Sequence, residues 1–283
     1  MTALAEQVET GLSPGERFAR AYVDDPSHAE IHFDFTITDA FEPTRDRPRV
    51  TVRNLFKKRR VDPDAAVTVW CESRAADAEA ASVVESALRR EAAFRFGTTD
   101  ATIGPVRAWV RIPDRLASDP GELARFLDYR LLVRLATAEN QALTIGKHGV
   151  LRHPGVARLP YRGSYVDGLL AACDEIEQTG ATAHAMVINP RDFYTHLLGA
   201  GTLLTDLARN GTMISRTRMV DPGCALVGDF AVAAELLDGG QSVIRVAEPP
   251  TGTFAEPGPA ICAEIHAGVA VHLPTHFFHV VPA

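Results

Sequence analysis

Hydrophobic residues recur every three or four positions in the middle of the chain, which is the period of an amphipathic helix. Asp119 can cap the start of this helix, Pro120 fits its first turn, and Glu122 can reach back to the free amide of the cap. Gly146 ends the pattern as a C-terminal cap. The sequence therefore predicts one continuous helix with a broad buried face. The residues of that face are Leu123, Leu127, Leu131, Leu135, Ala138 and Ala142, widened by Phe126, Leu132 and Val133.

Two alternating patterns precede the helix and predict half-buried strands, at Val67–Cys71 and at Val106–Ile112. The charged, alanine-rich segment between them is too long for a hairpin turn and is interpreted as a projecting arm, with a disordered surface insertion as the alternative. A two-stranded ribbon is at best marginally stable by itself in water, so we expect another copy of the chain to cover it. The candidate contact residues of the arm are Val84, Leu88, Arg89, Arg90, Phe94 and Phe96.

The second half of the chain predicts alternating strands and helices. A strand at His184–Ile188 precedes Asn189 and Pro190, which can cap and begin a short helix ending near Gly199. Strict alternation from Ala260 to Leu273 predicts a long strand near the C-terminus. An earlier helix ends at Gly180 and should bury one face, formed by Val166, Leu169, Leu170, Cys173 and Ile176.

The order of these segments resembles HK97-type phage capsid proteins. Val227–Phe230 (Val-Gly-Asp-Phe) resembles a segment of that family, and Val187–Phe193 is similar to its strand-to-helix turn. Ala260–Pro274 resembles the last strand of the family. Four segments and the helix that follows them resemble the extended loop and spine helix of these capsid proteins. The segments are Val84–Glu91, Phe94–Phe96, Val106–Ile112 and Leu116–Asp119.

The resemblance implies an α+β, HK97 phage-capsid-like fold. It would divide this chain into four parts. The N-terminal arm would be 1–30, and the peripheral domain with the spine helix would combine 31–65, 113–146 and 250–283. The extended loop would be 66–112, and the axial domain 147–249. The arm is expected to be amphipathic but broken at Gly11 and again at Ser13–Gly15. Gly199, Ala200, Gly201 and Thr202 form the candidate pore loop, with Asn210–Gly211 as another candidate.

The resemblance also implies self-assembly, because heterologous contacts that close by rotation build rings and cages. About sixty residues precede the ribbon, which is too few for a scaffold domain of typical size. Cross-linked members of the family join a ribbon lysine to an asparagine of a neighbour, but the lysines here are Lys57, Lys58 and Lys147, outside the ribbon. Covalent chain-mail is therefore not expected.

A short capsid-like chain resembles an encapsulin, the bacterial shell that encloses enzymes. The abundance of arginine and alanine, and the lack of a recognisable encapsulin N-terminal signature, point to a divergent group, such as the third family, associated with biosynthetic gene clusters. The function implied is a closed icosahedral nanocompartment of about sixty copies of this chain, with cargo enzymes inside.

Charge and composition fit a globular protein without a nucleic-acid partner. The 283 residues carry a formal net charge of -7, whereas phosphate binding calls for a concentrated basic face. The basic run Lys57–Arg60 is interpreted as a solvated loop or an inter-subunit contact. The N-terminus lacks an apolar signal core and no apolar run reaches membrane-spanning length, so a cytoplasmic location is expected. Four dispersed cysteines are expected to be reduced and buried: Cys71, Cys173, Cys224 and Cys262.

The sequence predicts no catalytic, cofactor or metal site. His272, His276 and His279 would gather as ligands only on a helix, which Pro274 forbids. Gly199–Gly201 lacks the lysine and the preceding strand of a phosphate loop. Ser215 and Ser242 lie in strand patterns without the turn that exposes a catalytic serine. Asp229 and Glu235 lie near a turn and a short helix, where capping and contact with solvent are enough to explain them.

Three other functions stay open at this point. A prophage or phage major capsid protein would share the fold and package DNA. A soluble α+β enzyme belongs to another class, and a scaffold that forms only rings is the third.

Overall fold

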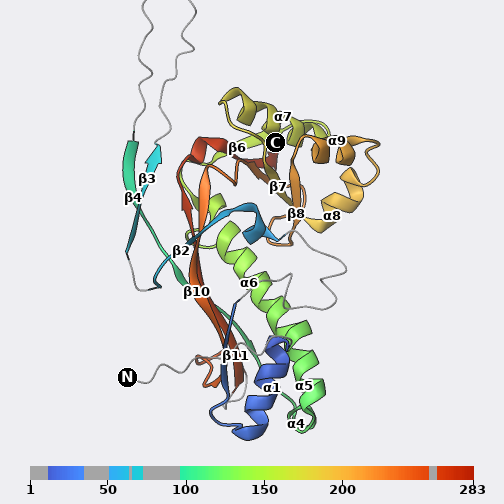
Figure 1. The fold of residues 1–283 in the computed structure, drawn as a ribbon. Helices are drawn as coiled ribbons and strands as arrows, with labels where there is room; N and C mark the ends of the chain where they lie inside the picture. The colour runs from blue at the N-terminus through green and yellow to red at the C-terminus, as the bar shows by residue number, and fades with distance from the viewer. Residues whose placement is uncertain (1–11, 35–50, 64–65, 73–95, 255–259) are drawn as a thin grey trace, which may run out of the picture. The chain divides into compact units, whose positions relative to one another are not determined.

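The computed structural model describes residues 12–34, 51–63, 66–72, 96–254 and 260–283. The chain divides into two compact units. Their boundaries fall inside helix α6 (Leu132–Thr144), strand β10 (Ala234–Ala247) and strand β11 (Ala260–Val271), and Figure 1 labels these three elements. Unit 1 comprises Met1–Arg49, Pro105–Ala138 and Gly240–His266. Unit 2 comprises Val50–Gly104, Glu139–Gly239 and Ala267–Ala283.

The first helix of unit 1, α1 (Pro14–Asp24), begins where the sequence predicted a break in the arm. Ser13 accepts a hydrogen bond from the Glu16 amide at 3.1 Å and donates its own amide to the Glu16 carboxylate at 2.7 Å, which is a complete capping box. The predicted interruption coincides with the start of α1: Ser13 is extended and caps the helix, and the arm before residue 12, with the predicted break at Gly11, lies outside the described residues. Gly15 lies so close to the Ala124 carbonyl of α5 that a side chain would collide with it.

The long helix begins as predicted but is not uniform. Asp119 accepts hydrogen bonds from the amides of Gly121 and Glu122 at 3.0 and 3.1 Å, which confirms the N-cap. The Glu122 carboxylate pairs with Arg125 at 2.8 Å instead of reaching back to the cap, so the predicted capping box is wrong. After α5 (Pro120–Phe126), one π-helical turn, η2 (Leu127–Leu131), precedes α6 (Leu132–Thr144).

The π turn coincides with a buried polar contact and with a change in the buried face. Asp128, 8% exposed, accepts a hydrogen bond from the Gly15 amide at 2.8 Å and one from the Ser13 hydroxyl. Leu132 is fully buried as predicted, but Val133 is 44% exposed. The inclusion of Val133 in the buried stripe is therefore wrong.

One sheet has the strand order β1-β10-β11-β5, with β2 beside β10. The predicted long C-terminal strand is confirmed as β11. Part of its expected polar face is also buried, because Cys262 and Glu264 are 0% and 5% exposed, whereas His266 is half-buried. All four cysteines are free, but the prediction that all are buried is wrong: Cys262 is buried, whereas Cys71, Cys173 and Cys224 are half-buried. The strands are β1 (Glu30–Phe33), β2 (Lys57–Arg60), β5 (Gly104–Val110), β10 (Ala234–Ala247) and β11 (Ala260–Val271).

Unit 2 contains a second sheet in the order β6-β12-β9-β7-β8. Helix α7 (Tyr165–Gln178) packs on it through Leu169 and Ile176, whereas Leu170, predicted on the same face, is 43% exposed. Asn189 accepts from the Arg191 amide at 2.9 Å, which confirms the predicted cap after β7. The strands are β6 (Ala157–Tyr161), β7 (Ala185–Ile188), β8 (Met213–Arg216), β9 (Ala225–Gly228) and β12 (Phe277–Pro282). The remaining helices and turns of the two units are α4 (Asp114–Ala117), η1 (Val52–Leu55), η3 (Val150–Arg152), α8 (Pro190–Asp192), η4 (Phe193–Leu197), α9 (Leu203–Arg209) and η5 (Pro274–His276).

A buried charge cluster ties helix α6 to the sheet inside unit 2. Arg53, on η1, contacts Glu139 of α6 at 3.0 Å and Asp238 of β10 at 3.1 Å. Glu139 is fully buried, and its Oε2 has no hydrogen-bond partner among the described residues. Burial raises the pKa of Glu139 to about 7, although Arg53 opposes this shift. One carboxyl oxygen of this cluster is thus buried without a hydrogen bond to offset its loss of solvent.

Replacing Glu139 should change how stability depends on pH. The native carboxyl keeps its proton up to about pH 7, while the unfolded chain releases it near pH 4.5, so the free energy of unfolding should fall as pH rises between these values. The fall attributable to this group is on the order of 3 kcal/mol. Glu139→Gln should remove it, as measured by urea unfolding followed by circular dichroism from pH 4.5 to 8. Glu175→Gln, on the exposed side of α7, is the control and should keep the wild-type slope; an unchanged slope in Glu139→Gln would contradict the assignment.

Candidate functional site

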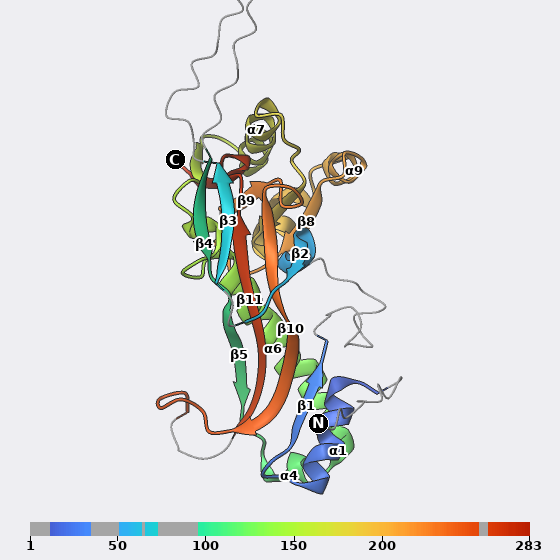
Figure 2. The same ribbon diagram turned by 60° about the vertical axis from the view of Figure 1, so that its left-hand side comes forward.

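A two-stranded ribbon in unit 2 is formed by β3 (Val67–Glu72) and β4 (Phe96–Ala101) (Figure 2). The strands are antiparallel, and Val69 lies opposite Thr99. The predicted partner of the first strand, Val106–Ile112, is wrong, because those residues lie largely in β5, beside β11. The sequence of β4, Phe-Gly-Thr-Thr-Asp-Ala, has no alternation of hydrophobic residues, so its pattern did not predict a strand.

One face of the ribbon is covered by the chain itself. Val67 and Val69 are 5% and 3% exposed and pack with Ile103, Leu237 and Ala270. The expectation that another copy must cover this ribbon is therefore wrong for its base. The strands keep their place because a small intramolecular cluster lies beneath them.

The opposite face of the ribbon is uncovered. Trp70 is 69% exposed and lies opposite Thr98, while the Thr68 hydroxyl donates to the Asp100 carboxylate at 3.0 Å. A tryptophan ring offers a large apolar area with a polar NH, which suits a contact with another molecule. This face, formed by Thr68, Trp70, Thr98 and Asp100, is named the Trp70 face.

His272 anchors the ribbon through its backbone and its ring. The Glu72 amide donates to the His272 carbonyl at 2.8 Å, and the His272 Nδ1 lies 3.0 Å from the Trp70 carbonyl oxygen. The other ring nitrogen lies 3.5 Å from Glu235, which belongs to β10 and not to a short helix as expected. Across the described ranges, no group of three histidine, cysteine or acidic residues could hold a metal ion.

The predicted contact residues of the arm are mostly outside the described residues. Val84, Leu88, Arg89, Arg90 and Phe94 lie in 73–95, between the two strands of the ribbon. Phe96 is the first residue of β4 and lies opposite Glu72. The role of all six in contacts between subunits stays a prediction.

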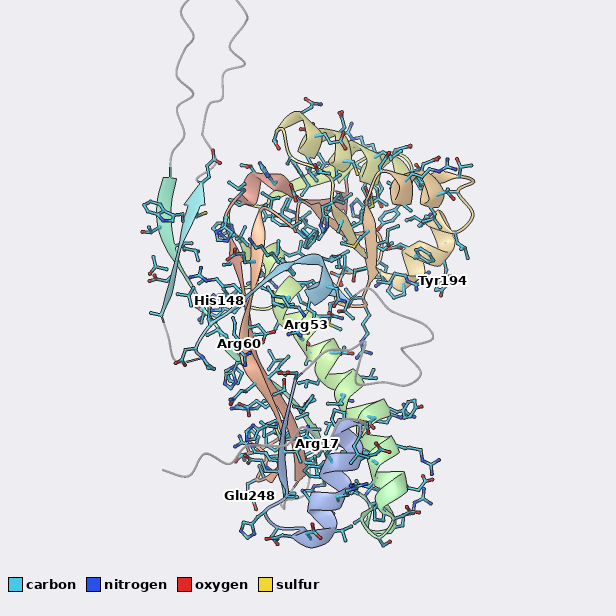
Figure 3. The ribbon with its side chains drawn as sticks, in the orientation of Figure 1. Arg17, Arg53, Arg60, His148, Tyr194 and Glu248 are labelled. Atoms are coloured by element: carbon cyan, nitrogen blue, oxygen red, sulfur yellow. The ribbon has the colours of Figure 1, made fainter. Side chains whose placement is uncertain are left out.

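The candidate pore loop, Gly199–Thr202, is a largely exposed turn between η4 and α9. Gly201 has φ +61°, a conformation that favours glycine, and the turn is closed by a hydrogen bond from the Ala200 amide to the Leu197 carbonyl at 3.1 Å. Tyr194 and Leu198, just before the turn, are 62% and 57% exposed. Figure 3 labels Tyr194. The turn therefore offers an uncovered, partly apolar surface, and a pore-lining role stays a prediction.

The basic run Lys57–Arg60 forms strand β2, so its interpretation as a loop is wrong. It pairs in parallel with Glu235–Asp238 of β10, and all four of its residues are exposed. Arg59 lies 3.8 Å from Glu235. Within the described part of the chain, no helix is long and apolar enough to span a membrane.

Comparisons with known proteins identify the fold. No protein-family model matches the chain. The chain is 22% identical over 246 residues to the major capsid protein of Enterobacteria phage HK97, a match that covers 80% of this chain and 63% of that protein. The chain thus spans less than two thirds of the length of this relative.

Solved structures agree with that match. A virus-like particle from Pyrococcus furiosus superposes with a TM-score of 0.54 at 13% identity, covering 82% of this chain and 92% of the other. The capsid of a native GTA particle gives 0.52 at 16% identity (82% and 90% covered), and Mycobacterium phage Adephagia gives 0.54 at 12% (83% and 90%). The chain has the HK97 capsid fold. This confirms the fold class predicted from the order of the segments, whereas the domain boundaries given for that fold stay a prediction.

Two neighbouring substitutions on β3 should separate the two faces of the ribbon. Val69→Ala removes buried methyl groups and should lower the free energy of unfolding by about 2 kcal/mol. Trp70→Ala, one residue away on the Trp70 face, should change it by no more than about 0.5 kcal/mol. Urea titrations at low protein concentration, followed by circular dichroism, measure both. A larger loss from Trp70→Ala than from Val69→Ala would contradict the described packing.

Proposed function

We propose that this chain is the subunit of a self-assembling protein shell. The observation that carries the proposal is the HK97 capsid fold together with the uncovered Trp70 face on its ribbon. The similar structures come from a virus-like particle and a capsid, which supports a particle built from many copies of one chain. In this proposal the role of the chain is structural, and its function depends on contacts between copies rather than on catalysis.

Within this shell, residues 66–112 act as an extended loop that lies over a neighbouring subunit. The base of the ribbon is fixed by Val67 and Val69, which leaves the Trp70 face exposed. This face and the six predicted arm residues would make the contact. The axial domain, 147–249, places the exposed turn Gly199–Thr202 around a symmetry axis. Closure by rotation then gives an icosahedral particle of about sixty copies, and many modest interfaces add to a stable shell.

The cargo we propose is an enzyme, as in an encapsulin nanocompartment of a bacterial cytoplasm. The net charge of -7 supports a protein content over nucleic acid, because packing phosphates requires neutralising positive charge. The second candidate is a phage major capsid protein that encloses DNA. It is supported by the HK97 relative, which bears that description, and by the exposed basic strand β2.

Electron microscopy of the purified full chain tests the shell directly. We expect closed particles of roughly 20–30 nm, a size estimated for about sixty domains of this length. A reconstruction of the same particles should place residues 199–202 around an axis. A monomer or dimer at micromolar concentration would overturn the shell proposal and favour the soluble enzyme, and open rings would favour the scaffold.

The content of the particles separates the two candidate functions. Nuclease-treated particles should contain little protected DNA and a co-purified enzyme in fixed proportion, measured by absorbance and mass spectrometry. Closed particles filled with nuclease-protected DNA would overturn the nanocompartment and support the phage capsid.

Shortening the arm tests its part in assembly. The pairing of Glu72 with Phe96 allows residues 73–95 to be replaced by Asn-Gly, which suits a two-residue hairpin turn. We expect this variant to keep the circular dichroism spectrum of the wild type and to sediment as single subunits or small oligomers. Intact closed shells from this variant would contradict the proposed role.

A second variant separates the length of the arm from its side chains. It replaces residues 73–95 by a glycine-serine linker of equal length, which is flexible and offers no apolar contacts. Loss of shells in both variants supports contacts made by the arm residues. Normal shells from the linker variant would show that Val84, Leu88 and the other arm residues make no required contact.

A further inference from the structure

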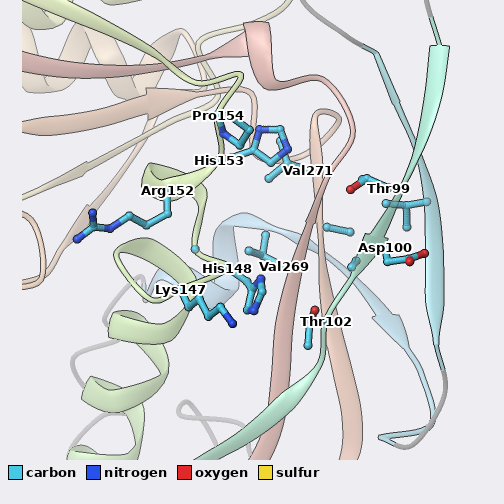
Figure 4. A pocket seen from close by; sticks show the side chains of 14 residues that line it. Thr99, Asp100, Thr102, Lys147, His148, Arg152, His153, Pro154, Val269 and Val271 are labelled. Carbon is cyan, nitrogen blue, oxygen red and sulfur yellow. The ribbon is translucent and has the colours of Figure 1, made fainter.

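A small pocket in unit 2 gathers hydrogen-bond donors from two separate parts of the chain (Figure 4). It has a volume of about 200 Å³ and lies between strand β4, strand β11 and the loop after helix α6. The loop contributes Lys147, His148 and His153, and the β4 side contributes Thr99 and Thr102. The pocket is distinct from the turn at Gly199–Thr202, and of the Trp70 face it includes Asp100 alone.

The loop side of the pocket is positively charged and lacks a carboxylate partner. Lys147 and His148 are exposed, and neither has an ion pair among the described residues. The His153 Nδ1 accepts a hydrogen bond from the Gly155 amide at 3.2 Å, so the ring carries its proton on Nε2. Burial lowers the pKa of His153, which keeps this ring a neutral donor.

The β4 side of the pocket adds two threonine hydroxyl groups, and the carboxylate of its Asp100 points away from them. Thr99 is paired with Val69, so both lie on the covered face of the ribbon, toward the pocket. Asp100 also lines the pocket, but its carboxylate lies on the opposite face of the ribbon, where it accepts a hydrogen bond from the Thr68 hydroxyl. Figure 4 shows the side chains of Asp100 and Arg152 pointing away from the group formed by Lys147, His148 and Thr102. The donors therefore line one pocket, and the one carboxylate of its lining, Asp100, is turned away from them and held by Thr68.

The dimensions and the apolar floor restrict what the pocket can hold. Its 200 Å³ is below the roughly 300–1,000 Å³ of pockets for drug-sized ligands, so a nucleotide or an extended cofactor is too large. Val69, Val269 and Val271 line the remaining wall. An ammonium, two imidazoles and two hydroxyls match the several acceptor oxygens of a tetrahedral anion.

We propose that this pocket binds a phosphate group, as inorganic phosphate or a small phosphate monoester. The Lys147 ammonium supplies the charge, His148 and the His153 Nε2–H donate hydrogen bonds, and Thr99 and Thr102 complete the set of donors. The valines accommodate a small apolar substituent of an ester. This site is independent of shell assembly, since all its residues belong to one unit of one chain.

The low lysine content makes the test simple. The chain has lysine at Lys57, Lys58 and Lys147, and the first two lie on the exposed strand β2. Brief treatment of the full chain with acetic anhydride, followed by peptide mass spectrometry, gives a rate of acetylation for each lysine. Inorganic phosphate, acetate and chloride are compared at equal ionic strength.

Phosphate at ten times its Kd should slow acetylation of Lys147 about tenfold, because only the unoccupied fraction reacts. Lys57 and Lys58 should keep their rates, and acetate and chloride should have little effect on Lys147. Equal protection by all three anions would reduce the effect to charge screening and overturn the site. Protection by acetate alone would overturn the choice of phosphate, and an unreactive Lys147 without added anion would indicate cover by another copy and also overturn the proposal.

Paired substitutions on one strand locate the effect. Thr99→Val removes a hydroxyl from the pocket side of β4 and should shift the phosphate concentration for half protection upward several-fold. Thr98→Val makes the same change on the Trp70 face and should leave it unchanged. His148→Asn should also weaken protection. Equal effects of Thr98→Val and Thr99→Val, in variants with the wild-type circular dichroism spectrum, would overturn the proposed geometry.

Discussion

The structure depends on a two-stranded ribbon that can hide only one of its faces. Val67 and Val69 are buried on a small cluster of the same unit, while Trp70 stays in solvent. The buried face fixes the base of the ribbon, and the exposed Trp70 face is available for contact with another molecule. The shell subunit that we propose would use both properties, because a contact surface that moves freely loses conformational entropy when it binds.

Buried carboxylates hold helices and strands in register within each unit, and their surroundings decide their charge. Burial alone would raise the pKa of Glu264 in unit 1, but Arg107 at 2.8 Å and Arg245 at 3.2 Å hold it below the ordinary value. Glu139 in unit 2 has one arginine, which it shares with Asp238, and its pKa is raised to about 7. Desolvation thus dominates the pKa of the fully buried Glu139, whereas two guanidinium groups outweigh it at Glu264.

The sequence predicted those parts of the fold that local rules determine. The caps at Asp119 and Asn189 and the long strand β11 follow from side-chain chemistry and period, and the order of segments was enough to indicate the capsid fold. Strand β4 was missed because its pairing rests on backbone hydrogen bonds rather than on hydrophobic alternation. Val133 and Leu170 carry the hydrophobicity of core residues but are exposed, and a single chain gives no signal of what would cover them. The phosphate pocket has no motif, since its donors come from a loop and a strand that only the fold brings together.

The contrast between β3 and β4 has a consequence for how this ribbon tolerates variation. A shift of pairing by one residue would turn Trp70 inward and Val69 outward, so β3 alone enforces the alignment of the two strands. Strand β4 presents small polar residues on both sides and would slide at little cost were its partner less demanding. Substitutions should therefore be tolerated at the exposed positions of β4, such as Thr98, while the pairing of the two strands is set by β3.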